Sequence, residues 1–112
     1  MQLTVIRADD SVTHLALSGR LDVQGVNAVQ DQFSFQATAR HRATLVDLSQ
    51  VSFMASLGIG MLVESARALR HRGVKMVLLA PTADVRKTLE AAGIHQVIPI
   101  AATADAADAL LQ

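Results

Sequence analysis

The chain has 112 residues, of which 51% are hydrophobic, so we expect one core and a single domain over residues 1–112. A formal net charge of zero and an aromatic content of only 3% argue against direct binding of nucleic acid. Cysteine is absent, which excludes disulfides, thiolate metal sites and thiol catalysis. No apolar run approaches the ~20 residues of a membrane span and the N-terminus lacks signal-peptide features, so we expect a cytoplasmic protein without membrane insertion.

The first third of the chain predicts a β-hairpin followed by a helix. The runs LTVIRA and VTHLALSG are rich in strand formers and flank a turn at Asp9–Ser11. Leu15 and Leu17 alternate with smaller or polar residues, so helices should cover mainly one face of this strand. Asp22 is expected to cap the helix, although Gly25 weakens its start. Its inward face should comprise Val26, Val29, Phe33 and Ala37.

The middle of the chain predicts the central strand and the longest helix. ATLVDLS, residues 43–49, has strand composition and is expected to end at the polar residues Asp47 and Ser49. A loop including Met54 should follow, and then a helix that ends before Gly73. The buried face of that helix is expected to contain Ile59, Leu62, Val63, Ala66 and Leu69.

Four further elements complete the predicted order. VKMVLLA reads as a strand, and Thr82 can cap a helix that ends at Gly93 and buries Val85, Leu89 and Ala92. A short strand around QVIPI and a last helix capped by Thr103 follow. The order ββαβαβαβα predicts an α/β fold, with a mixed sheet that carries one antiparallel edge strand.

Few residues are arranged for chemistry. The histidines, at positions 14, 41, 71 and 95, show no helical metal-site spacing, and no carboxylate pair is placed for acid–base catalysis. Asp47 near a strand end suggests a phosphate-accepting receiver domain, but Asp9 and Asp10 lead into a strand rather than a helix. A turn-forming role for Asp47 is therefore preferred. We expect neither an enzyme, a metal site nor a cofactor.

Ser56 stands at the predicted start of the long helix, immediately before LGIGMLV. Its hydroxyl can act as the N-cap, accepting a hydrogen bond from a free main-chain N–H. The same position also tolerates a phosphate, because free N–H groups and the positive end of the helix dipole face it. The residues alone leave these two roles open.

The strings GRLD (19–22), LVDLSQVSFMASLGIGMLV (45–63) and GVKMVLLAPTADVRKTLEAAGIHQVIPI (73–100) resemble the STAS family, specifically the bacterial anti-sigma factor antagonists. The resemblance covers nearly the whole chain and implies a STAS-like fold. It also implies that Ser56 matches the serine that a kinase-type anti-sigma factor phosphorylates. Ala55 and Leu57 depart from the family pattern, in which an aspartate and a small hydroxyl residue are usual.

Two hypotheses follow from this resemblance. In the first, the protein is a switch that binds an anti-sigma factor serine kinase while Ser56 is unphosphorylated and is released on phosphorylation, with a serine phosphatase as a second candidate partner. In the second, it is a scaffold module that is never phosphorylated, for example one that packs on a transporter ATPase. The expected contact residues are Asp22, Met54, Ala55, Ser56, Leu57 and Gly58; Met54 and Leu57 have burial in the core as their alternative.

Overall fold

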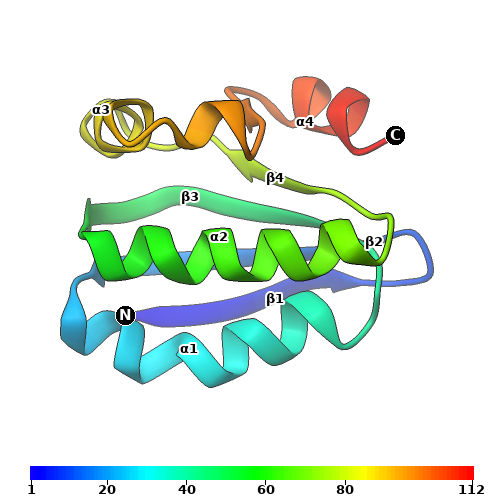
Figure 1. The fold of residues 1–112 in the computed structure, drawn as a ribbon, viewed down its shortest axis with the longest axis horizontal. Helices are drawn as coiled ribbons and strands as arrows, with labels where there is room; N and C mark the ends of the chain where they lie inside the picture. Colours follow the sequence, from blue (N-terminus) through cyan, green and yellow to red (C-terminus); the bar gives the residue numbers. More distant parts are fainter.

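The computed structural model describes all of residues 1–112 as one five-stranded sheet with four α-helices (Figure 1). The strands are β1 (Gln2–Ala8), β2 (Val12–Leu21), β3 (Ala43–Met54), β4 (Met76–Leu79) and β5 (Ile100–Ala101). The helices are α1 (Val23–Thr38), α2 (Ser56–His71), α3 (Ala83–Ala91) and α4 (Ala104–Leu111), with a 3₁₀ turn, η1, at Ile94–Gln96. The sheet order is β1-β2-β3-β4-β5, in which β1 is antiparallel to β2 and all other neighbours are parallel. The predicted α/β order, the antiparallel edge strand and the central position of β3 are confirmed.

The main core lies between the sheet and the helices α1 and α2, which run side by side across one face (Figure 1). All the predicted inward residues of α1 are buried there, as are Leu15 and Leu17 of β2. The helix α4 covers the opposite face and forms a smaller cluster with Val77 and Leu79 of β4. Because both faces of β4 are covered, its four residues are all buried.

The helix boundaries follow the predicted capping residues. Asp22 accepts a hydrogen bond from the Gly25 N–H at 2.9 Å, and the hydroxyls of Thr82 and Thr103 make the equivalent bonds at 3.3 and 3.2 Å. Gly73 adopts a left-handed conformation just beyond α2, as glycine readily does after a helix. The capping predictions for α1, α3 and α4 are therefore confirmed.

The strand β3 is longer than predicted. It continues to Met54, so Asp47 lies inside the strand, and the prediction that Asp47 ends it is wrong. The Asp47 carboxylate accepts a hydrogen bond from the Ser49 N–H at 2.8 Å, where the pairing with β2 shifts register. This side chain supports a β-bulge, after which the strand resumes.

Two predictions near the C-terminal end need correction. The short strand predicted around QVIPI is present, but β5 is confined to Ile100–Ala101 because η1 takes up the start of the segment. Pro99 has no N–H to donate to a strand ladder, although its carbonyl accepts a bond from Leu78. Ala92, expected to face the core, is exposed because α3 has already ended at Ala91.

Candidate functional site

The helices α1 and α2 both begin at the edge of the sheet where β2 and β3 end. Leu21 and Met54, the last residues of these two parallel strands, are paired with each other. The Ala55 N–H donates a hydrogen bond of 2.9 Å to the Leu21 carbonyl oxygen. The predicted site residues Asp22 and Ser56 follow directly, so both lie at the carboxyl edge of the sheet, where α/β proteins commonly place their sites.

Two glycines allow the helix starts to pack closely against the end of β2. A Cβ atom at Gly25 would stand 1.9 Å from the Arg20 carbonyl oxygen. A Cβ atom at Gly58 would stand 3.0 Å from the Leu21 Cβ and 3.2 Å from the Leu21 carbonyl oxygen. Gly25 is therefore required at the start of α1 for close packing, which corrects the expectation that it only weakens the helix.

Asp22 occupies a small polar network at this edge. One carboxylate oxygen caps α1 through Gly25, and the other lies 3.4 Å from the Arg20 Nε. The bond from the Gly25 N–H, aided by the Arg20 guanidinium, lowers the pKa of Asp22 below the usual value for an aspartate. The Arg20 guanidinium also lies over the Phe53 ring, 4.4 Å from its centre, as a cation–π contact.

Ser56 is the first residue of α2 and its side chain is exposed, as predicted. Its predicted capping role is wrong, because the N-cap position belongs to Ala55, whose side chain has no acceptor. The main-chain N–H groups of the first turn have no partner within the helix, and no side chain of the protein caps them. The positive end of α2 is thus left free beside the Ser56 hydroxyl.

The structure divides the other predicted contact residues into two groups. Met54 was expected in a loop but ends β3 and is only 4% exposed, so it belongs to the core. Gly58 is also buried, and its part in the site is to let α2 approach Leu21. Leu57 is 52% exposed and Ala55 is partly exposed, so these two remain on the surface with Ser56.

Sequence reasoning missed Phe53, Val23 and Arg20. Phe53 and Val23 are 40% and 56% exposed, large values for apolar side chains, and both adjoin the predicted residues in sequence. Strict strand alternation from the buried Val51 would have placed Phe53 inward. A second register shift in the pairing of β2 with β3, between Gly19–Val51 and Arg20–Phe53, turns Phe53 outward, so its exposure could not be predicted from the residue pattern.

The histidines and carboxylates do not gather into a metal-binding cluster. The four histidines lie on β2, in the loop before β3, at the end of α2 and in η1, with no metal-binding group of three or more His, Asp or Glu side chains. No helix is both long enough and apolar enough to cross a bilayer.

Comparison with known proteins agrees with this architecture. The anti-sigma-F factor antagonist RsfA of Mycobacterium tuberculosis is 26% identical over 104 residues, which cover 91% of this chain and 81% of RsfA. The crystal structure of an anti-sigma factor antagonist from Mycobacterium paratuberculosis superposes with a TM-score of 0.84 at 22% identity, covering 98% of this chain and 94% of that one. The phosphorylated form of the Bacillus cell fate determinant SpoIIAA gives a TM-score of 0.71 at 21% identity, covering 97% and 99%. Residues 4–107 match the STAS domain, and the chain belongs to the STAS domain family.

Proposed function

We propose that this protein is an anti-sigma factor antagonist whose binding to a kinase-type anti-sigma factor is controlled by phosphorylation of Ser56. The observation that carries the proposal is the exposed Ser56 hydroxyl at the uncapped start of α2, on the same edge of the sheet as Asp22. RsfA is named as an antagonist of this class, and SpoIIAA has a phosphorylated form. Such a protein would act in the cytoplasm and is not itself an enzyme.

The proposed contact surface consists of Asp22, Val23, Phe53, Ala55, Ser56 and Leu57. Its three large apolar side chains, Val23, Phe53 and Leu57, are exposed in the free protein and would lose contact with water in a complex. Asp22 and Arg20 supply charge at the same edge. Apolar anchors combined with a fixed charge are the features from which a specific interface draws affinity and orientation.

Phosphorylation would change binding more than folding. A phosphate on Ser56 adds about −1.5 to −2 charges at neutral pH. The free N–H groups and the helix dipole of α2 favour a negative charge there, so the helix should remain folded. The same charge at the centre of an apolar contact must lose its hydration without a matched partner, which typically costs several kcal/mol. A serine phosphatase would restore the binding form.

The test uses the purified kinase-type anti-sigma factor, ATP and three variants. Incubation with ATP should place one phosphate on Ser56, located by mass spectrometry. By calorimetry, Ser56→Asp should bind at least tenfold more weakly, whereas Ser56→Ala should bind nearly as tightly as the parent. Ser34→Asp, which adds the same charge on the exposed face of α1 about three turns into the helix, should leave affinity unchanged.

Equal affinities of Ser56→Asp and the parent would remove Ser56 from the interface. If mass spectrometry finds no phosphate, or finds it on another residue, regulation by phosphorylation of Ser56 is excluded, even if the proposed contact surface binds the anti-sigma factor.

The second candidate function is a scaffold that is never phosphorylated, for example one packed on a transporter ATPase. It is favoured by Ala55 and Leu57, which stand where the family usually has an aspartate and a small hydroxyl residue. Leu57 is exposed and enlarges the apolar surface beside Ser56, which suits a permanent contact with a partner protein. Tight binding to an ATPase that is insensitive to Ser56→Asp would favour this role.

A further inference from the structure

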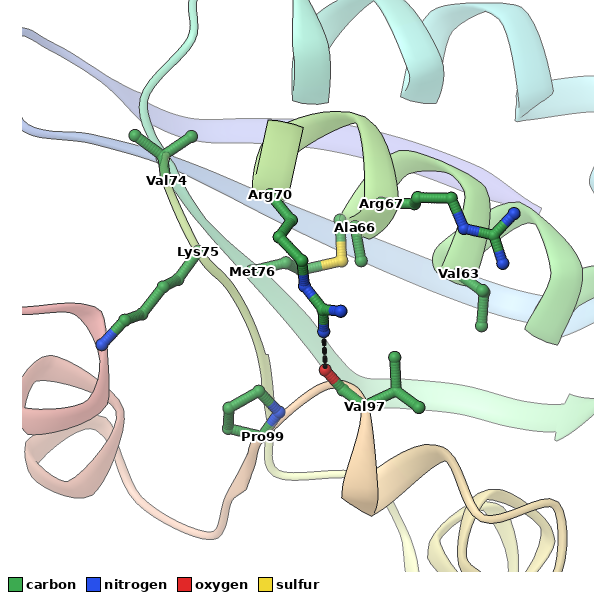
Figure 2. Close-up of a pocket in the computed structure, with 9 residues that line it drawn as sticks. All are labelled: Val63, Ala66, Arg67, Arg70, Val74, Lys75, Met76, Val97 and Pro99. Atoms are coloured by element: carbon green, nitrogen blue, oxygen red, sulfur yellow. Dashed lines mark hydrogen bonds between the residues drawn. The ribbon is translucent and has the colours of Figure 1, made fainter. Parts of the chain in front are cut away.

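A second site lies on the far half of α2, away from Ser56. A cavity of about 190 Å³, open to solvent, lies between α2, the start of β4 and the segment that joins η1 to β5 (Figure 2). Its apolar lining is supplied by Val63, Ala66, Val74, Met76, Val97 and Pro99. Arg67, Arg70 and Lys75 complete the wall. The volume corresponds to roughly six water molecules, which suits a small molecule rather than a protein segment.

The charged side chains that line this cavity are all positive. None of the nine lining residues is acidic, and no Asp or Glu occurs between Ser65 and Ala83. Glu64, the one acidic residue of α2, lines a different hollow together with Asp31 of α1. Three other hollows on the surface each include at least one carboxylate. Cationic side chains beside an apolar floor, with no acidic side chain among them, favour an anion.

Arg70 is the central cation of this cavity. Figure 2 shows its side chain reaching from α2 to the segment after η1, where Nη2 donates to the Val97 carbonyl oxygen at 3.3 Å. A guanidinium has five N–H donors, so most remain available to a ligand, and their fork matches a carboxylate or phosphate. Lys75 donates to the main-chain oxygen of Gln112 at 3.0 Å, and Arg67 makes no ion pair.

We propose that this cavity binds a small amphipathic anion, in which a carboxylate or phosphate contacts Arg70 and a short alkyl chain lies on the apolar lining. The anionic group gains charge-assisted hydrogen bonds from Arg70, with Arg67 and Lys75 adding to the local positive potential. The alkyl chain removes parts of the Val63, Ala66 and Val97 side chains from water. The site is independent of phosphorylation at Ser56, and its test requires no protein partner.

The test measures binding of hexanoate and of hexyl phosphate by NMR titration of the full chain. Hexanol and inorganic phosphate are the controls that carry only the alkyl chain or only the charge. We expect saturable shifts of the Val63, Ala66, Met76 and Val97 amides with one or both amphipathic anions, and weaker binding of both controls. The tighter of the two anions identifies the group, carboxylate or phosphate, that the cavity prefers.

Three variants separate a specific site from general attraction of anions. Arg70→Gln should weaken binding roughly tenfold or more, because it removes charged hydrogen bonds. Arg72→Gln makes the same change of charge outside the cavity and should have little effect. Ala66→Leu should fill the cavity and abolish binding, while unfolding curves check that each variant remains folded. The proposal is overturned by equal losses in Arg70→Gln and Arg72→Gln, by unchanged binding in Ala66→Leu, by hexanol binding as tightly as the anions, or by no saturable shift with either anion.

Discussion

The two glycines Gly25 and Gly60 should respond in opposite directions to the same substitution. Both lie in helices, and replacement of a helical glycine by alanine normally stabilises the fold by ~0.5–1 kcal/mol through lower flexibility of the unfolded chain. A Cβ atom at Gly60 meets nothing within 4 Å, so Gly60→Ala should show this gain in full. A Cβ atom at Gly25 would stand 1.9 Å from the Arg20 carbonyl oxygen, which is main chain and must move.

The magnitude of the Gly25→Ala effect follows from that overlap. Forcing extra volume into a packed site costs ~1–3 kcal/mol, which exceeds the gain from reduced flexibility. The gain from reduced flexibility is common to both variants, so they should differ by the packing cost of roughly 1–3 kcal/mol in the free energy of unfolding, with Gly25→Ala the less stable. Because the displaced segment carries Arg20 and Asp22, Gly25→Ala should also weaken binding at the proposed contact surface.

Urea denaturation followed by far-UV circular dichroism provides the measurement, with the parent protein as reference. Equal slopes of the three unfolding curves would show that the variants alter stability rather than the cooperativity of unfolding. If Gly25→Ala unfolds at the same urea concentration as Gly60→Ala, the start of α1 does not need its close approach to Arg20. The close packing of Gly25 against the Arg20 main chain would then not be what holds the start of α1 in place.

Three further predictions concern the core, the effect of acid and the start of α2. Leu62→Ala should cost roughly 2–5 kcal/mol because Leu62 is fully buried, whereas Leu57→Ala should leave stability nearly unchanged and weaken partner binding; equal denaturation midpoints would contradict this. Hydrogen bonds from Arg7 and two main-chain N–H groups lower the pKa of Asp9 to about 2 from an ordinary value of 3.8, so its stabilisation is complete above the higher value and disappears as pH falls through the lower one. Asp9→Asn should therefore make unfolding less dependent on pH in that window, as acid titrations of both proteins would show. Ala55→Asp should stabilise the protein by about 1 kcal/mol, because Ala55 already has the extended conformation of an N-cap and a carboxylate there can accept a hydrogen bond from a first-turn N–H. An unchanged thermal midpoint would show that the first-turn N–H groups are not available for capping.

The sequence predicted most of the fold because local signals and tertiary packing agree in most elements. The caps Asp22, Thr82 and Thr103 each precede an apolar pattern of helical period, and the structure uses all three. The strand–helix alternation then restricts the sheet to a parallel arrangement with an added hairpin. Asp47 is the exception, because a polar residue in an apolar run can mark either the end of a strand or a bulge inside it. It was predicted to end the strand, whereas the structure shows that it supports a bulge.

The candidate site was predicted less completely because its composition depends on contacts between distant segments. Ser56 was identified from its position at the helix start and from the resemblance, and Asp22 from the resemblance, but Phe53 becomes part of the surface only through the extension of β3 and the position of Arg20 over its ring. Met54 was predicted as a contact residue but is buried, because the sequence alone does not show whether a methionine beside a motif lies on the surface or in the core. Burial, which decides between them, is a property of the assembled sheet.

At the start of α2, the residue at position 55 determines the electrostatic surroundings of Ser56. A side-chain oxygen at position 55 would occupy the first-turn N–H groups, and Ser56 would then lie beside a capped helix end. Ala55 leaves those N–H groups free, so the positive end of the helix is available to whatever negative charge position 56 acquires. The departure from the family pattern therefore removes a carboxylate that would repel a phosphate and compete with it for the same donors. Position 55 therefore bears on both candidate functions: the missing carboxylate favours the scaffold, whereas the free N–H groups would make a phosphate on Ser56 easier to accommodate in the folded protein.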